Sequence, residues 1–191
     1  ALTGCTALTE CAIPENVTSI GDYAFASCEK LTTMTFPSAL EEIGAHVFEG
    51  CSALTTLSEF PQTLTDIGEN AFYKTAVTAF SVSEESEDYA AVDGVLYNKD
   101  LTSLIAYPTG STSTTVQFPA EIADIEANAF AYARNLKSIV LPEGLTNIGE
   151  SAFAYSGLTH ITSLASGLSI KEQAFTGCVD LVSVNFKGAV S

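Results

Sequence analysis

The chain has 191 residues, 47% of them hydrophobic, which suits a folded domain or a short repeat array and excludes a disordered chain. Its 23 Asp and Glu residues against 7 Lys and Arg give a net charge of −16, which repels nucleic-acid phosphates and anionic lipid headgroups, so we expect no nucleic-acid partner. No apolar run approaches the roughly 20 residues of a membrane span, and no membrane insertion is expected in this segment.

An internal repeat runs along the chain from its first residues. Six times an Ile stands five residues before a Phe, in the pairs Ile20 and Phe25, Ile43 and Phe48, Ile67 and Phe72, Ile125 and Phe130, Ile148 and Phe153, and Ile170 and Phe175. Successive Phe residues are 22 to 24 positions apart, except for one step of 58 that holds an insertion. Leu2 takes the Phe position of a first coil, which we expect to be truncated. The repeat predicts about seven stacked coils in a single domain, residues 1–191.

After each Phe, the chain predicts a short strand. Two apolar residues recur there with two residues between them, at Leu31 and Met34, Leu54 and Leu57, Val77 and Phe80, Leu136 and Ile139, Leu158 and Ile161, and Leu181 and Val184. A third apolar residue follows two or three positions later, and such side chains point inward when identical coils stack and their strands pair in parallel. All six prolines directly follow an apolar residue that closes a strand, where no backbone donor is needed, at positions 14, 37, 61, 108, 119 and 142.

The segment from each Ile to its Phe predicts the opposite side of the coil. It reads Ile20-Gly21-Asp22-Tyr23-Ala24-Phe25 in the first complete copy and is too short for a normal helix. We interpret it as one or two turns of α or 3-10 helix on the convex side. The predicted fold class is therefore α/β: a solenoid with a parallel β-sheet on its concave face and short helical turns on its convex face.

The insertion covers about residues 83–115. It opens with an acidic run from Glu84 to Asp88, and its Asp93-Gly94 pair lies between apolar runs, which is a strong signal for a β-hairpin. We expect a hairpin or meander that projects from the array. Residues 115–118 should then rejoin the repeat as a strand.

The repeated motif resembles the BspA-type leucine-rich repeats, a family of bacterial cell-surface and secreted proteins. The segment from Ile20 to Leu31, with its copies, carries the resemblance, and so does the segment Asp93-Gly94-Val95-Leu96-Tyr97 of the insertion. The resemblance covers essentially the whole chain. It implies a leucine-rich-repeat solenoid that is extracellular or at the cell surface, often used in adhesion to host proteins or other cells. The family has no shared catalytic residues.

The cysteines occupy structural positions of the repeat. Cys5, Cys28, Cys51 and Cys178 each stand three residues before the Leu that opens a strand, where other coils have Thr75, Ala133 or Ser156. That position requires a small residue that tolerates burial, and Cys11 takes an inward strand position. We expect reduced, buried thiols. Disulfides between neighbouring coils and a metal site are the alternatives.

The other candidate groups for chemistry lie apart from one another. His46 takes a convex position and His160 a strand position in a distant coil, so no nucleophile and base pair is predicted. The acidic run from Glu84 to Asp88 is either a solvated loop or a calcium site, although it lacks the alternating carboxylates of a calcium loop. We predict no enzyme activity and no catalytic, cofactor-binding or metal-binding residues.

The outward strand positions are the default binding surface. They carry small, hydroxyl-rich side chains, and the candidates for partner binding are Thr33, Thr35, Thr56, Ser58, Ser138, Val140, His160 and Thr162. The sequence thus favours a non-enzymatic recognition or adhesion module that binds a protein or a glycan. The alternative is a structural spacer within a longer surface solenoid.

Overall fold

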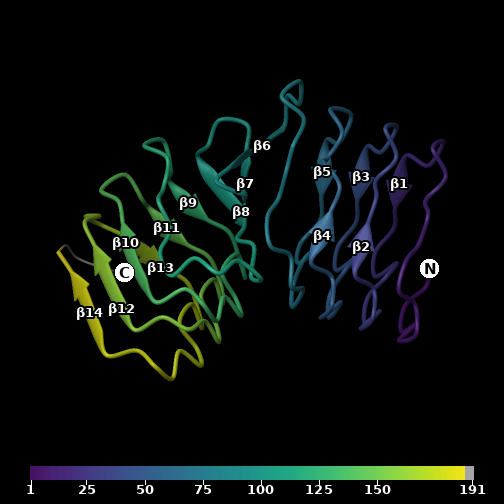
Figure 1. The fold of residues 1–191 in the computed structure, drawn as a ribbon. Coiled ribbons are helices and arrows are strands. Elements are labelled where there is room, and N and C mark those ends of the chain that lie inside the picture. The colour runs from purple at the N-terminus through teal and green to yellow at the C-terminus, as the bar shows by residue number, and fades with distance from the viewer. Residues whose placement is uncertain (188–191) are drawn as a thin grey trace.

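The computed structural model describes residues 1–187 and contains about seven stacked coils. The coils lie side by side from the N-terminus at one end of the array to the last strand at the other (Figure 1). Short strands, turns, bends and irregular segments make up the described residues, and no helix occurs among them. The leucine-rich-repeat solenoid that the sequence predicts is confirmed.

One set of strands forms where the sequence places the concave face. These concave-face strands are β2 (Thr33–Met34), β4 (Thr56–Leu57), β10 (Ser138–Leu141), β12 (His160–Ser163) and β14 (Ser183–Phe186). They pair in parallel, and the register brings Ile139, Ile161 and Val184 of successive coils into one row. Alternate side chains of β10 and β12 are buried, as the period of two of a strand requires.

A second set of strands, which the sequence did not predict, forms on the convex side. These convex-side strands are β1 (Ser19–Ile20), β3 (Glu42–Ile43), β5 (Asp66–Ile67), β9 (Asp124–Ile125), β11 (Asn147–Ile148) and β13 (Ser169–Ile170). Each ends on the Ile of the repeat and pairs in parallel with the same strand of at least one neighbouring coil. A polar residue followed by a buried or half-buried Ile therefore forms a two-residue strand in each of these coils.

The helical turns predicted between each Ile and its Phe are wrong. The residue two before the Phe and the residue two after it both have positive φ in most coils, as Tyr23 and Ser27 do at 57° and 59°. A right-handed helix cannot contain such residues. The amides of Tyr23 and Phe25 donate to carbonyls of the next coil, while the amides of Ala24 and Ala26 donate back within their own turn. The backbone donors are thus shared between coils, which a helix would not allow.

The insertion forms a meander, as predicted, but it does not project from the array. Its strands β6 (Tyr89–Val92), β7 (Val95–Asn98) and β8 (Ser103–Ala106) are antiparallel, and β8 then pairs in parallel with β9. The pair of Leu104 and Ile125 shows that β8 takes the place of a convex-side strand. The meander therefore lies within the stack, between the two halves of the solenoid (Figure 1).

The meander divides the interior into two hydrophobic cores. In β7, Leu96 packs with the N-terminal core, whereas Val95 and Tyr97 pack with the C-terminal core. The Phe residues of the repeat form two stacked rows in the same way: Phe25, Phe48 and Phe72 in the first, and Phe130, Phe153 and Phe175 in the second. Tyr107 begins the second row, with its ring 4.8 Å from that of Phe130. Strand β7 is consequently buried on both faces and separates the cores.

The concave-face strands likewise form two separate sheets. Strands β2 and β4 form one, and β10, β12 and β14 form the other. Between them, the expected strands at residues 77–82 and 115–118 are absent, and a single bridge joins Phe60 to Val82. The amide of Phe80 instead donates to the carbonyl of Gly94, at the turn of the meander. The continuous concave sheet that the repeat predicts is interrupted because this turn lies at the break.

Candidate functional site

The eight predicted concave-face residues all reach solvent. Five are exposed and three are half-buried, and the half-buried ones are Ser58, Ser138 and Thr162. Val140 is 51% exposed, which is unusual for an apolar residue in the middle of a four-residue strand. The inward neighbours of these residues lie in the cores, so the outward side chains stand on a rigid support.

The structure brings these residues together as two groups instead of one stripe. In the C-terminal group the register aligns Ser138 with His160 in one row and Val140 with Thr162 in the next. In the N-terminal group Thr33 lies beside Thr56, and the Ser58 hydroxyl accepts a hydrogen bond from the amide of Phe36 at 2.9 Å. The two groups belong to different sheets, so a partner that touches both must cross the break between them.

Each group borders a hollow in the surface. A cavity of about 630 Å³ is lined by Glu10, Glu15, Thr33 and Thr35, among other residues. A second cavity of about 380 Å³ is lined by Ser138, Val140, Thr115 and Gln117, among others. Thr115 and Gln117 were not among the predicted site residues. The alternation of residues 115–118 could have found them, because it places these two side chains on the same face as Ser138 and Val140.

Three of the cysteine thiols donate a hydrogen bond to a backbone carbonyl of the preceding coil. The thiols of Cys28, Cys51 and Cys178 donate to the carbonyls of Leu2, Phe25 and Phe153 at 3.2, 3.0 and 3.1 Å. The Thr75 hydroxyl at the same position instead donates within its own coil, to the carbonyl of Phe72 at 2.9 Å. The position therefore takes a small side chain, and Ala133 in another coil shows that a side-chain donor is not required there.

All five cysteines are free thiols, and two of them are fully buried. Burial raises the pKa of Cys51 to about 11 and also raises that of Cys28. A thiol with a raised pKa is a poor nucleophile at neutral pH, so the position of these residues agrees with the structural role predicted for them.

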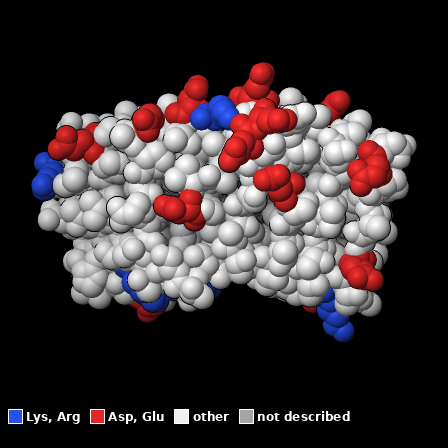
Figure 2. Space-filling view, turned by 45° about the horizontal axis from the view of Figure 1, so that its top comes forward, with Lys and Arg blue, Asp and Glu red and all other residues white. Residues whose placement is uncertain are grey.

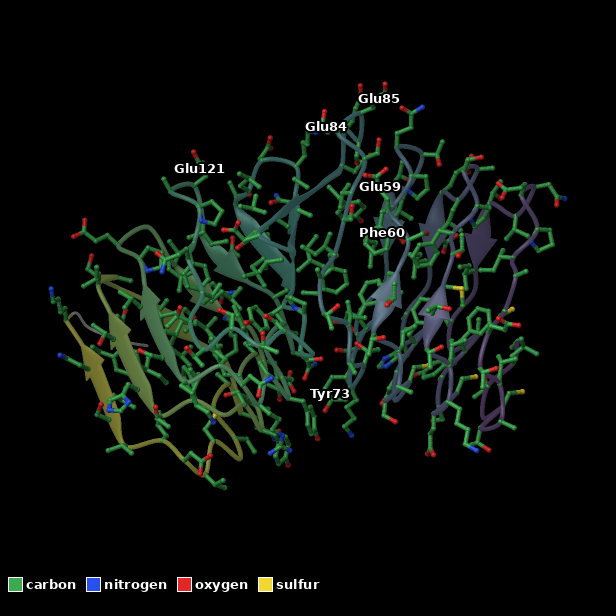
Figure 3. All side chains as sticks on the ribbon, in the orientation of Figure 1. Glu59, Phe60, Tyr73, Glu84, Glu85 and Glu121 are labelled. Carbon is green, nitrogen blue, oxygen red and sulfur yellow. The ribbon has the colours of Figure 1, made fainter. Side chains whose placement is uncertain are left out.

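The remaining candidates are not brought together. His46 Nδ1 lies 2.8 Å from Glu49 and its ring stacks on Tyr23, while His160 Nδ1 lies 2.8 Å from the hydroxyl of Thr159. In the acidic run, Glu84 and Glu85 are exposed at one edge of the molecule (Figure 3). Within residues 1–187, no group of three or more His, Cys, Asp or Glu side chains has the spacing of a metal site. The described chain also contains no helix able to cross a membrane.

Sequence reasoning also missed an aromatic cluster on the turns that follow the Phe residues. Tyr73, Tyr132 and Tyr155 lie in contact there, and Lys74 and Arg134 lie against their rings. The signal was present in the alignment of the coils. The position two after the Phe is Ser, Gly or Lys in four coils, but it is Tyr in the two coils that hold Tyr132 and Tyr155.

Comparison with known proteins assigns the chain to a family. The BspA type leucine rich repeat region (6 copies) matches residues 1–108 and 106–191. The crystal structure of the pneumococcal vaccine antigen PcpA is 29% identical with a TM-score of 0.73, and the match covers 91% of this chain and 50% of that one. A leucine rich cell surface protein from Faecalibacterium prausnitzii is 23% identical with a TM-score of 0.63, and the match covers 100% of this chain and 76% of that one.

How much of each chain is covered decides whether a match shows a shared fold or a shared family. The chain spans half the length of the pneumococcal structure, and among curated proteins none matches it. The match to the Faecalibacterium protein shows the shared fold. The family match spans the chain from its first residue to its last, and its residues carry the repeat described above. The chain therefore belongs to the BspA-type leucine-rich-repeat family.

Proposed function

We propose that the protein is a non-enzymatic recognition module, secreted or at a bacterial cell surface, that binds a protein or a glycan through its concave-face strands. The observation that carries the proposal is the burial pattern of β10 and β12. Their inward side chains, such as Ile139 and Ile161, are fully buried, and their outward side chains are left to solvent. The backbone groups of the strand pairs are hydrogen-bonded to each other, so side chains make the contacts with a partner.

The chemistry of the outward positions favours a polar partner surface. Ser138, His160 and Thr162 offer donors and acceptors, and Val140 adds one exposed apolar contact. Such a flat, hydroxyl-rich face suits many small contacts more than one deep anchor, because Trp, Tyr and Arg are absent from the eight positions. The resulting affinity should be moderate and should depend on several residues together.

The family supports the same reading. BspA-type repeats occur in bacterial surface proteins, and leucine-rich-repeat solenoids are typically binding modules and not enzymes. The similar pneumococcal structure is a vaccine antigen, which supports an exposed location. The alternative role of a spacer in a longer surface solenoid makes a different prediction, since a spacer needs no partner on its concave face.

A binding screen with three variants tests the proposal. The purified protein is presented to immobilised extracellular-matrix proteins and to a glycan panel. One variant carries Thr33→Lys and Thr56→Lys in the N-terminal sheet, and a second carries Ser138→Lys and Thr162→Lys in the C-terminal sheet. The control carries Ser19→Lys and Asn147→Lys, which add the same charge to the convex-side strands.

The outcomes separate the possible roles. A ligand that binds the wild type and the control, but is lost with either concave-face variant, supports the proposal and says which sheet holds the contact. A ligand that all the variants bind equally would move the site away from the concave face. The absence of any ligand, with every protein folded by circular dichroism, would favour the spacer.

A further inference from the structure

A row of tyrosines runs across the junction between the two halves of the solenoid. The rings of Tyr73 and Tyr132 meet edge to face with centroids 5.6 Å apart, and the rings of Tyr132 and Tyr155 stack at 5.1 Å. Tyr73 precedes the meander and Tyr132 follows it, so the row joins turns that are far apart in sequence. The same two coils are also joined by a hydrogen bond in which the side-chain amide of Asn128 donates to the side-chain oxygen of Asn70 at 2.9 Å.

Two of the seven basic residues lie against the rings of this row. The Lys74 Nζ lies 5.1 Å from the ring centroids of both Tyr73 and Tyr132, and the guanidinium carbon of Arg134 lies 5.4 Å from the Tyr132 centroid. Cations held against aromatic faces keep their remaining N–H groups free for an anion.

Two of the tyrosines are held in a backbone conformation that their side chains disfavour. Tyr132 and Tyr155 have φ values of 64° and 57°, and the same position is Gly50 or Gly177 in other coils. A bulky residue with positive φ is a genuine outlier, because its Cβ crowds the backbone. Gly177 in turn leaves the space that the Tyr155 ring fills, since a Cβ there would lie 2.4 Å from that ring. Ser27 and Lys74 have positive φ at the same position, so what distinguishes this edge is the aromatic side chain that two of the coils carry there.

The charge of the molecule makes this edge distinct. Acidic side chains are spread over the upper part of the face in Figure 2, and basic side chains are few. Figure 3 places Tyr73 at the edge opposite Glu59, Glu84, Glu85 and Glu121. At physiological salt, charges are screened beyond about 8 Å, so the acidic edge has little effect on a ligand at the tyrosine row. Glu49 is a closer carboxylate, and its charge adds to the raised pKa of Tyr73, which burial mainly causes.

We propose that the edge formed by Tyr73, Lys74, Tyr132, Arg134 and Tyr155 is a second interaction surface, which binds an acidic, aromatic-containing segment of a protein partner. Lys74 and Arg134 bind carboxylates of the segment, and the tyrosine hydroxyls donate to them. Tyr155 is 41% exposed, and the accessible part of its ring contacts an aromatic side chain of the partner. Tyr and Arg are the residues that dominate protein interfaces, and the edge combines both with positive charge in an acidic protein. None of these residues belongs to the concave-face strands, so this second surface can be tested independently of partner binding at the concave face.

Binding of a defined peptide to the intact protein tests this surface. The probe is a fluorescently labelled peptide of alternating glutamate and tyrosine, and a peptide with glutamine in place of every glutamate is its control. Fluorescence anisotropy should show saturable binding of the acidic peptide that weakens as salt rises. The variant Lys74→Ala with Arg134→Ala should weaken binding about tenfold or more, as loss of a hot spot does. The variant Lys30→Ala with Lys171→Ala removes the same charge elsewhere and should change the affinity less than about twofold.

The Tyr155→Gly variant separates binding from folding. Glycine occupies this turn position in two other coils, so the variant should unfold as cooperatively as the wild type while it binds the acidic peptide about tenfold more weakly. Glu49→Gln, which removes the nearby carboxylate, should strengthen binding. The proposal is overturned if the acidic peptide does not bind, if the glutamine peptide binds as well, or if both double variants weaken binding equally. It is also overturned if chondroitin sulfate binds this edge in place of the peptide, or if Ser138→Lys with Thr162→Lys abolishes peptide binding.

Discussion

Replacing Gly149 by alanine should destabilise the stack, because the preceding coil leaves no room for a methyl group. A Cβ on Gly149 would lie 2.5 Å from the amide nitrogen of Ala127 and 2.7 Å from the carbonyl carbon of Glu126. Both are backbone atoms, so they cannot rotate away as a flexible side chain can. The φ of Gly149 is not positive, so alanine meets no conformational penalty of its own there. The steric clash between the new methyl group and the preceding coil therefore determines the change in the free energy of unfolding.

The expected loss follows from two opposing terms. Overpacking of a tight interior costs about 1–3 kcal/mol, and a backbone neighbour places this site in the upper part of that range. Alanine also restricts the unfolded chain, which recovers about 0.4–1 kcal/mol. The net loss in the free energy of unfolding should be about 1–2 kcal/mol. In a chain of this size that lowers the midpoint of thermal unfolding by about 2–8 °C.

Gly21 provides a matched control, because it follows the repeat Ile in an earlier coil and a Cβ there would meet nothing within 4 Å. Gly21→Ala should leave the stability unchanged or raise it by up to about 1 kcal/mol. Thermal and guanidinium unfolding followed by circular dichroism measure both variants under the same conditions. If Gly149→Ala unfolds at the wild-type midpoint, or if Gly21→Ala is destabilised to the same degree, the reasoning from coil contact is wrong.

The other predictions concern the cores and the buried titratable groups. Phe130→Ala should lower the free energy of unfolding by about 3–5 kcal/mol, because that ring is fully buried and stacked on both sides. Phe175→Ala should lower it clearly less, because Phe175 is half-buried and stacks on one ring. Equal losses in guanidinium unfolding would contradict this prediction. Cys51 should react with iodoacetamide at mildly alkaline pH far more slowly than the three half-buried cysteines, and mass spectrometry of the alkylated peptides checks this. Because burial raises the pKa of Tyr89 and Tyr97 from 10.0 to about 12, their neutral forms contribute stability that is complete below pH 10 and is lost as the pH rises to about 12. The unfolding midpoint should therefore fall between about pH 10 and about pH 12, and Tyr97→Phe should reduce that fall.

Some of the candidate site was predictable from the repeat alone. Once the apolar positions of a strand are aligned, alternation assigns Ser138 and Val140 to the outward face, and the structure leaves both accessible to solvent. The pairing of Ser138 with His160 follows from the constant offset between coils. The tyrosine row was harder to predict, because Tyr73 and Tyr132 are 59 positions apart and meet only when the meander between them folds back into the stack.

The convex turns show why the helical expectation failed. A short segment with small and apolar residues fits one turn of helix when its hydrogen bonds are assumed to be local. In the stacked coils, the amides of residues such as Phe48 and Phe130 donate to the next coil instead. The residues of one coil do not specify which carbonyls the next coil places beside them. Helix propensity therefore could not predict the acceptors of these backbone amides.

The sequence by itself determined the number and spacing of the coils, the inward positions of the strands and the meander at Asp93-Gly94, because these depend on periodicity and local turn chemistry. Tertiary structure decided that the meander joins the stack and that β7 faces a core on each side, with Leu96 turned to one and Tyr97 to the other. It also decided that the concave surface is two groups of residues and not one. The physical reason is that a strand must pair its backbone groups with whichever neighbour the fold supplies, and that neighbour is chosen by packing across the whole chain.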